Sequence, residues 1–237
     1  MFHKRSQQLE LLDLGPSYYS KAEYENCLYQ LDRIGRFTGG NIATLKTFRK
    51  VAAPQTILDV GCGGGQFTLE LAKQFPEAQI VGIDISSQAI EFAEERLQET
   101  SLKNVRFKIP PTSELSYLPN SFDIVTTTLV CHHMTDDQLI DFLKKSYQVA
   151  TKFIIINDLH RHWLAYFGFA LIAPTFFRNR LIFNDGLLSI KRAFKKKDWM
   201  NYLHAAAIPL ERCSITWHWA FRWVVCIDKA STPSHLN

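Results

Sequence analysis

The sequence lacks several features that would assign it to whole classes of protein. Its five cysteines are scattered and no two have CxxC spacing, so neither a disulfide framework nor a zinc site is expected. No apolar run reaches the roughly 20 residues that a membrane-spanning helix needs. The longest run, residues 163–177, contains Pro174. The polar start MFHKRSQQLE has no apolar signal-peptide stretch, so we expect a cytoplasmic location.

An excess of charge of one sign is also missing. The 27 Lys and Arg residues face 23 Asp and Glu residues, which gives a net charge of only +4 over 237 residues. Such a balance does not indicate a nucleic-acid partner. A basic cluster at residues 191–197 follows the apolar stretch, so we expect at most a peripheral contact with an anionic membrane.

Short apolar runs that alternate with amphipathic segments predict the fold class. Strands are expected at residues 56–60, 79–83, 105–109, 122–127 and 153–156, with a terminal hairpin formed by 210–217 and 221–227. Helices are expected between most of these strands, one of them opened by a capping box at Thr135 and Gln138. This order predicts an α/β protein with a Rossmann-like, mostly parallel seven-stranded sheet, helices on both faces and an antiparallel C-terminal hairpin.

The segments outside this alternation predict the domain organisation. Residues 1–54 are expected to form an N-terminal helical cap, with amphipathic helices at 21–36 and 41–51 joined at Gly39-Gly40. We expect this cap to close over the ligand as a lid. Residues 55–237 are expected to form the main domain, with a substrate-side insertion at about 160–192. Within it, an apolar helix from Trp163 to Ala173 is expected, and then an irregular segment that runs to Arg192.

A glycine loop follows the first predicted strand. In ILDVGCGGG, residues 57–65, Gly61, Gly63 and Gly65 allow a tight turn and close approach to a ligand. The carboxyl ends of parallel strands, where Asp59 and Asp84 lie, are where such sheets bind ligands. A dinucleotide fingerprint would need a third glycine where Gln66 stands, and the carboxylate of Asp59 would repel a pyrophosphate.

Four motifs occur in order: ILDVGCGGG at 57–65, VGIDIS at 81–86, SFDIVTTTLVCHHM at 121–134 and FIIINDLHRH at 153–162. Together they resemble the class I S-adenosylmethionine-dependent methyltransferase family over about residues 55–160. Residues 157–192 further resemble bacterial relatives of the ubiquinone and menaquinone biosynthesis methyltransferases.

The resemblance implies S-adenosylmethionine as cofactor and S-adenosylhomocysteine as product. It assigns the methionine end to Asp59 and the glycine loop, the ribose to Asp84 and one side of the adenine to Ile85. The family often has an acid for the adenine amino group, but that position falls near Pro111 here. The adenine is therefore assigned to Thr112, with Ser113 and backbone groups as alternatives.

Methyl transfer mainly requires alignment of the acceptor with the activated methyl group, and a base only if the acceptor arrives protonated. Candidate polar groups near the ends of the fourth and fifth strands are His132, His133, Asp158, His160, Arg161 and His162. We predict His133 as the base, with His132 next, and no metal site, because no carboxylate triad or CxxC pair accompanies the histidines. Aromatic residues of the segment 160–183 are expected to wall an acceptor pocket.

The predicted function is methyl transfer to a small apolar or aromatic acceptor, such as a phenol, a quinol or a polyketide-like molecule, by O- or C-methylation. Two alternatives stay open: a nicotinamide-dependent reductase, and a non-catalytic module that binds the cofactor. The sequence does not indicate which acceptor is used or what oligomeric state the protein adopts.

Overall fold

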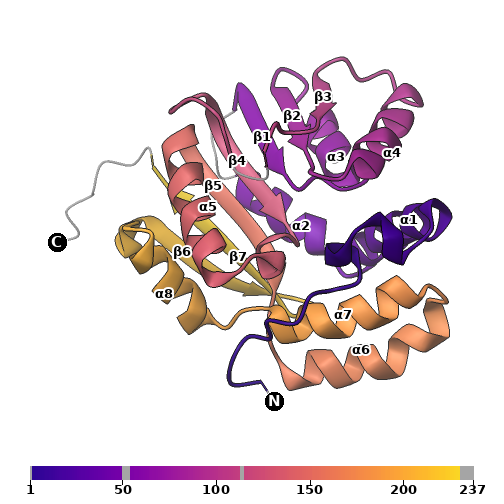
Figure 1. Ribbon diagram of the computed structural model, residues 1–237. Helices are drawn as coiled ribbons and strands as arrows, with labels where there is room; N and C mark the ends of the chain where they lie inside the picture. The colour runs from indigo at the N-terminus through magenta and orange to yellow at the C-terminus, as the bar shows by residue number, and fades with distance from the viewer. Residues whose placement is uncertain (1, 50–53, 113–114, 230–237) are drawn as a thin grey trace.

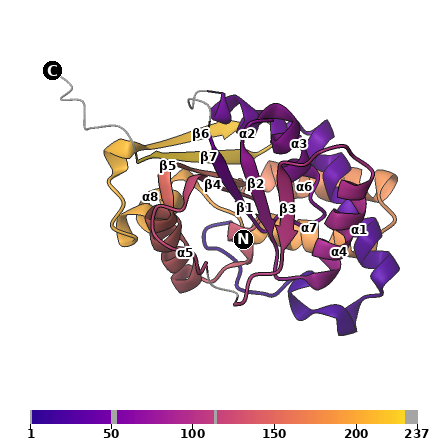
Figure 2. The ribbon, with the colours of Figure 1, turned by 90° about the horizontal axis from the view of Figure 1, so that it is seen from above.

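The fold is built on one seven-stranded sheet, which is central in the computed structural model of residues 2–49, 54–112 and 115–229 (Figure 1). The strand order is β3-β2-β1-β4-β5-β7-β6. The strands are β1 (Thr56–Val60), β2 (Gln79–Ile83), β3 (Val105–Lys108), β4 (Phe122–Thr128), β5 (Ala150–Leu159), β6 (Cys213–His218) and β7 (Arg222–Asp228). Strands β1 to β5 pair in parallel, whereas β7 is antiparallel to both β5 and β6. This hairpin forms the edge opposite β3 (Figure 2).

Two apolar layers cover the faces of the sheet, because neighbouring residues of a strand point to opposite faces. On β1, for example, Ile57 packs with one layer and Leu58 with the other. The first layer holds α2 (Gly40–Phe48), α3 (Gln66–Gln74) and α4 (Ser87–Gln98). The second holds α5 (Asp136–Val149) and α8 (Lys196–Ala205). A parallel sheet covered on both faces is the expected result of βαβ connections.

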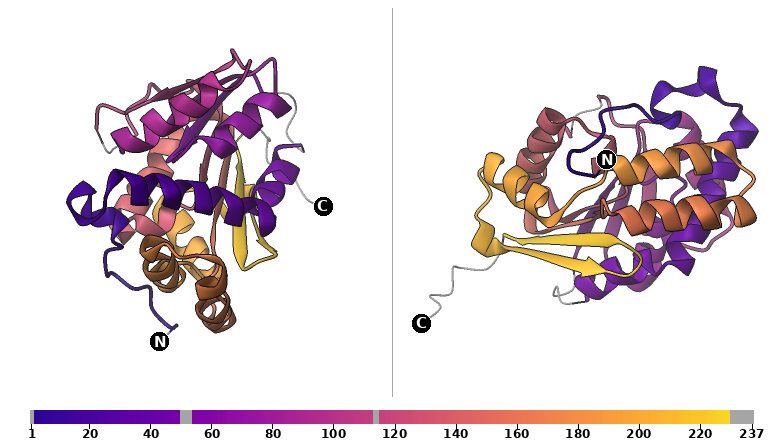
Figure 3. Two further views of the ribbon diagram at one scale, coloured as in Figure 1. Left: turned by 90° about the vertical axis from the view of Figure 1, so that its right-hand side faces the viewer. Right: turned by 90° about the horizontal axis from the view of Figure 1, so that it is seen from below.

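Three further helices lie across the end of the sheet where β1 and β4 finish. They are α1 (Lys21–Phe37), α6 (Trp163–Phe176) and α7 (Arg180–Arg192). Seen from below, α6 and α7 lie side by side in front of the strands (Figure 3, right). Cys27 of α1 packs on Leu181 and Ile182 of α7, which joins the N-terminal cap to the insertion after β5.

The predicted fold class is confirmed, and the five central strands begin and end within a few residues of their predicted bounds. The capping box that opens α5 at Thr135 and Gln138 is also confirmed. The end of the second N-terminal helix was predicted at Val51, which lies outside the described residues. No helix in the described ranges is long and apolar enough to cross a membrane.

One predicted element is wrong. The segment expected to be irregular up to Arg192 contains the helix α7, which begins after Asn179, whose side chain accepts a hydrogen bond from the N–H of Leu181. The Asn-Asp-Gly sequence at 184–186 is a turn signal. Here Gly186 instead permits close packing of two helices, because a Cβ at this position would lie 2.6 Å from the ring of Phe169 on α6.

Candidate functional site

The glycine loop joins β1 to α3, and its glycines are required by the backbone itself. Gly61, Gly63 and Gly65 have φ values of +70°, +51° and +75°, a region that other residues rarely adopt. A Cβ on Gly61 would lie 2.3 Å from Val130, and one on Gly65 would lie 2.7 Å from Phe107. The loop is therefore held close to the neighbouring strand ends, as the sequence predicts for a ligand-binding loop.

Asp84 fixes this loop from the end of β2. Its two carboxylate oxygens accept hydrogen bonds from the backbone N–H groups of Gly63 and Ser86, each at 2.9 Å. Burial raises the pKa of Asp84, although these backbone hydrogen bonds oppose the shift. The carboxylate thus lies between the glycine loop and the first turn of α4, at the carboxyl edge of the sheet.

Asp59, at the end of β1, lies deeper. It is only 2% exposed, and one carboxylate oxygen accepts a 2.6 Å hydrogen bond from the hydroxyl of Thr68 on α3. Burial and, to a smaller extent, the nearby charge of Asp84 raise the pKa of Asp59 to about 7, although the hydrogen bond from Thr68 opposes the shift. Asp59 is therefore a buried carboxyl at the end of β1, where the glycine loop begins.

Apolar side chains are left uncovered beside Asp84. Ile85 is 72% exposed, and Ile109, which follows the neighbouring strand β3, is 53% exposed. The pairing of Ile83 with Lys108 places these two isoleucines at adjacent strand ends. The hydroxyl of Thr112 lies 3.4 Å from that of Ser116 at the surface, and Ser113 lies outside the described residues. Ile109 was not identified as a candidate site residue from the sequence, because the sequence indicated only that it ends a strand.

The two predicted base candidates lie on a 3-10 turn, Cys131–His133, after β4. His132 is 3% exposed, and its Nδ1 lies 2.7 Å from a carboxylate oxygen of Asp158 at the end of β5. The N–H of His132 donates to the other oxygen of the same carboxylate. The neighbouring imidazole lowers the pKa of Asp158 in spite of its burial. His132 is thus turned into the protein.

His133 is only partly buried. Its Nδ1 lies 2.7 Å from the carboxylate of Asp13, which comes from the N-terminal segment. The Nε2 atom faces Glu10, whose carboxylate oxygen lies 3.9 Å away. Of the two predicted bases, His133 is therefore the more exposed, with 28% of its side chain accessible against 3% for His132.

Sequence reasoning missed the residues that hold these histidines. The guanidinium of Arg192 on α7 donates to the main-chain carbonyls of His132 and His133 and also binds Asp13. Glu10 is fully buried against the same cluster. No local sequence pattern indicates these contacts, because Glu10 and Asp13 lie far from the histidines in the sequence. The one available signal was the acidic pair itself, placed among leucines at 9–14.

The expected aromatic wall needs a correction. Trp163, Phe167 and Phe176 of α6 are all more than half exposed, so they do not wall an enclosed pocket. Phe169 and Phe177 turn inward and pack with the cluster between α1 and α7. The reason is that α6 is apolar all round, so the sequence could not indicate which of its faces is buried.

The other polar candidates have structural partners. Arg161 is buried and bonds to Asp198 and to the carbonyl of Ala193. His162 caps α6 by accepting the N–H of Leu164, and His160 accepts the indole N–H of Trp217. These residues do not join the cluster around His133.

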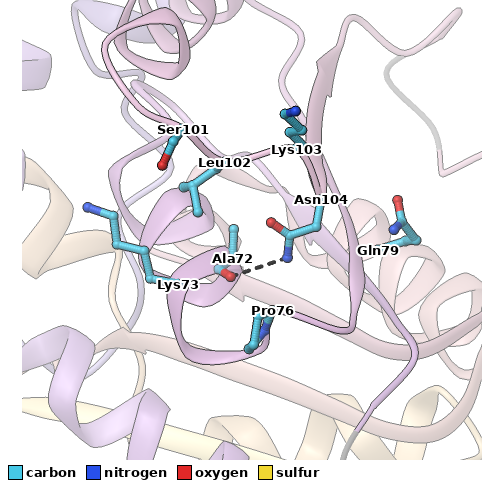
Figure 4. A pocket seen from close by; sticks show the side chains of 8 residues that line it. All are labelled: Ala72, Lys73, Pro76, Gln79, Ser101, Leu102, Lys103 and Asn104. Atoms are coloured by element: carbon cyan, nitrogen blue, oxygen red, sulfur yellow. Dashed lines mark hydrogen bonds between the residues drawn. The ribbon is translucent and has the colours of Figure 1, made fainter.

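A hollow of about 540 Å³ lies at the opposite end of the sheet, between α3 and the start of β3 (Figure 4). One of its lining side chains, Asn104, donates to the carbonyls of Ala72, Phe75 and Ala78, so its amide NH₂ group is already satisfied. Ligands of this fold class bind at the carboxyl ends of the strands. The candidate site is therefore the edge formed by the glycine loop, Asp84 and His133.

Comparison with known proteins finds similarity to methyltransferases. Residues 53–165 match the family described as a methyltransferase domain. An uncharacterized methyltransferase of Schizosaccharomyces pombe is 38% identical over 86 residues, which is 34% of this chain and 31% of that protein. The demethylmenaquinone methyltransferase of Lactobacillus johnsonii is 32% identical over 102 residues, 42% of this chain and 41% of that protein.

The match to these relatives therefore spans less than half of their length. The overall fold is more widely shared: a SAM-dependent methyltransferase from Aquifex aeolicus superposes with a TM-score of 0.64 at 17% identity, covering 87% of this chain and 98% of that one. Residues 53–165 of this chain are thus similar to methyltransferase domains, and the chain shares the fold of a solved S-adenosylmethionine-dependent methyltransferase.

Proposed function

We propose that this protein transfers the methyl group of S-adenosylmethionine to a small apolar or aromatic acceptor. The observation that carries the proposal is the position of Asp84, whose carboxylate is held by the glycine loop at the carboxyl edge of the sheet. A carboxylate at this place suits the hydroxyl groups of a ribose. The methyltransferase-domain match favours this function over a nicotinamide-dependent reductase.

The cofactor lies, in this proposal, along the ends of β1, β2 and β3. The methionine end sits at Gly61, Gly63 and Gly65, where the negative charge of Asp59 favours its ammonium group. The adenine lies against the exposed side chains of Ile85 and Ile109, because a flat apolar ring would cover both. Thr112 stays a candidate for its amino group.

The acceptor lies beyond the cofactor, toward His133. In the reaction, a nucleophilic oxygen or carbon of the acceptor forms a bond to the methyl carbon while the bond from that carbon to sulfur breaks, and the sulfonium becomes a neutral thioether. If the acceptor is a phenol or quinol, Nε2 of His133 takes its proton. Asp13, bonded to Nδ1, holds the ring and stabilises the imidazolium that results. His132, bonded to Asp158, supports the ring of His133 at a centroid distance of 4.3 Å.

The exposed side of α6 suggests where an apolar acceptor comes from. Six large apolar side chains of this one helix are exposed: Trp163, Leu164, Phe167, Leu171, Ile172 and Phe176. Lys191 and the lysines at 195–197 follow nearby in the chain. An apolar surface followed in the chain by basic residues fits a peripheral contact with an anionic membrane, from which lipid-soluble acceptors could be taken. Sedimentation with anionic lipid vesicles, compared with neutral ones, tests this contact.

Calorimetry and a turnover assay test the proposed function together. Binding of S-adenosylmethionine and S-adenosylhomocysteine without binding of NADH is the expected result. Tight NADH binding without S-adenosylhomocysteine binding would overturn the cofactor assignment. Methyl transfer is then followed by mass spectrometry on a panel of phenols, quinols and polyketide-like compounds. Cofactor binding with no turnover on any of them would favour a non-catalytic module.

A further inference from the structure

Glu10, His132 and His133 converge at one place although two segments distant in sequence supply them. One potential ligand atom of each residue, a carboxylate oxygen or an imidazole nitrogen, lies within 4.8 Å of the other two. Glu10 reaches the site from the N-terminal segment, and the histidines come from the turn after β4. No spacing rule in the sequence could reveal this group, because its members meet only in the folded chain.

Both imidazoles are already oriented as metal-binding histidines are. Nδ1 of His132 lies 2.7 Å from Asp158, and Nδ1 of His133 lies 2.7 Å from Asp13. A carboxylate on one ring nitrogen fixes the tautomer and makes the other nitrogen the better ligand. The two Nε2 atoms face Glu10, at 3.8 and 3.9 Å from its carboxylate oxygens. Each carboxylate thus aims one imidazole at Glu10.

The carboxylate of Glu10 provides an independent sign that a ligand belongs here. Glu10 is 1% exposed, and its Oε2 accepts a hydrogen bond from the hydroxyl of Ser189. Its Oε1 has no hydrogen-bond partner within the described ranges. A buried acceptor without a partner is costly. Oε1 faces into the group formed with His132 and His133, where an ion would satisfy it.

The distances exclude direct hydrogen bonds but suit a shared ion. A hydrogen bond needs about 2.7–3.2 Å between the heavy atoms, so gaps of 3.8 and 3.9 Å are too long. Two ligands at about 2.0–2.1 Å from a tetrahedral ion lie about 3.4 Å apart. The three ligand atoms lie within 4.8 Å of one another, so they would move closer by at most about 1.4 Å to surround one ion.

Arg192 does not take the place of such an ion. Its Nε lies 3.8 Å from Oε1 of Glu10, but each of its nitrogens donates elsewhere, to His132, His133, Gln8 and Asp13. Its one positive charge faces two carboxylates, those of Glu10 and Asp13. The group can therefore accept further positive charge.

We propose that Glu10, His132 and His133 bind a divalent first-row transition metal ion, for which zinc serves as the probe. Two histidines and one carboxylate form a ligand set for zinc and for non-haem iron, with remaining positions open to water or another ligand. A metal on Nε2 of His133 excludes proton transfer to that atom, so the metal and the base role proposed above are alternative states of one cluster. The metal site itself does not depend on methyl transfer.

Zinc binding to the metal-stripped full chain tests the proposal without any activity measurement. Calorimetry should give one zinc per chain, and thermal unfolding should shift upward with zinc concentration because the ion binds the folded state. X-ray absorption should show nitrogen and oxygen ligands at about 2.0–2.1 Å. Sulfur ligands at about 2.3 Å would assign the zinc to the cysteines and overturn the site.

The zinc affinities of single-residue variants test whether the ion binds at these three residues. Glu10→Gln keeps the shape of the side chain and should weaken zinc binding at least tenfold, as should His133→Asn. The exposed His204 on α8 supplies the control, since His204→Asn should bind zinc like the wild type. A cooperative thermal unfolding transition without zinc confirms that each variant is folded. If Glu10→Gln does not fold, His133→Asn provides the test instead. Wild-type zinc affinity in the folded variants, or no zinc bound to the wild type, would overturn the proposal.

Discussion

Cofactor affinity should depend on pH through Asp59. Burial raises the pKa of this carboxyl to about 7, so near neutral pH it is only partly ionised before the cofactor binds. An ammonium group bound at the glycine loop favours the ionised form. A nearby opposite charge commonly lowers a carboxyl pKa by about 1–3 units. If the shift here is about 1–2 units, at about 1.36 kcal/mol per unit, S-adenosylmethionine should bind roughly 8- to 50-fold more tightly at pH 8 than at pH 5.

The sign follows from the two protonation states. At low pH Asp59 is protonated with or without the cofactor, and affinity is at its lower plateau. As the pH rises, the complex ionises first, so binding releases a proton and affinity increases until the free protein also ionises near pH 7. Calorimetry in buffers of different ionisation heat measures both the affinity and the released proton. Asp59→Asn should flatten the profile, and a slope equal to that of the wild type in this variant would refute the reasoning.

The same carboxyl gives a readout in the free protein. The pKa of Asp59 in the folded chain is raised from 3.8 to about 7, so its contribution to stability is complete below pH 3.8 and is lost as the pH rises toward 7. Asp59→Asn has no charge to bury. The variant should therefore gain stability relative to the wild type between pH 4 and pH 8, so its free energy of unfolding minus that of the wild type should increase, which urea titrations at several pH values can measure.

Two other site residues give direct tests. Asp84→Ala should weaken S-adenosylhomocysteine binding by about 1.5–3 kcal/mol, because it removes charge-assisted hydrogen bonds, and calorimetry showing wild-type affinity would contradict the ribose assignment. If the acceptor is a phenol, His133→Ala should slow methyl transfer about 100-fold or more near neutral pH without changing cofactor affinity. The loss should shrink at high pH, where a phenol ionises without help, and full activity of the variant would leave alignment as the whole mechanism.

The fold could be predicted because its signals are local. Each buried parallel strand is a short apolar run, and each glycine of the loop stands where the backbone needs a positive φ. The helix α7 could not be predicted in this way. Its Asn-Asp-Gly sequence indicates a turn, and the helix is stabilised by the packing of Leu181 and Ile182 on α1. That contact joins segments that are far apart in the sequence.

The candidate site likewise combines features that local sequence indicates with features that depend on tertiary contacts. Asp59, Asp84 and the histidine pair follow strands, so their common edge of the sheet could be predicted from strand order. The residues that orient the histidines could not be predicted. Asp13 and Glu10 belong to an N-terminal segment that has no helix-like or strand-like periodicity of apolar residues. The role of α6 also depends on tertiary structure, since an all-apolar helix does not indicate which side is covered.

The N-terminal cap is predicted to act as a lid, and the structure indicates how it would be held closed. Leu28 of α1 lies over the glycine loop, with its Cδ2 3.7 Å from the position that a Cβ on Gly63 would take. Asp32 of the same helix forms a part-buried ion pair with Arg96, which also donates to the carbonyl of Gly64 at 3.1 Å. A cofactor bound at the loop would therefore lie beneath α1 and touch the residues that anchor it.

Amide hydrogen exchange with and without S-adenosylhomocysteine tests this motion. Exchange over residues 21–37 should slow when the ligand binds, whereas α5, on the far face of the sheet, should not change. Asp32→Asn removes an ion pair worth about 1 kcal/mol, so exchange of α1 in the free protein should rise roughly fivefold. The ligand should restore part of that protection, because it supplies new contacts under the helix. Ligand-dependent protection of the glycine loop alone, with α1 unchanged, would mean that the helix is a static cover and that the cofactor enters by another path.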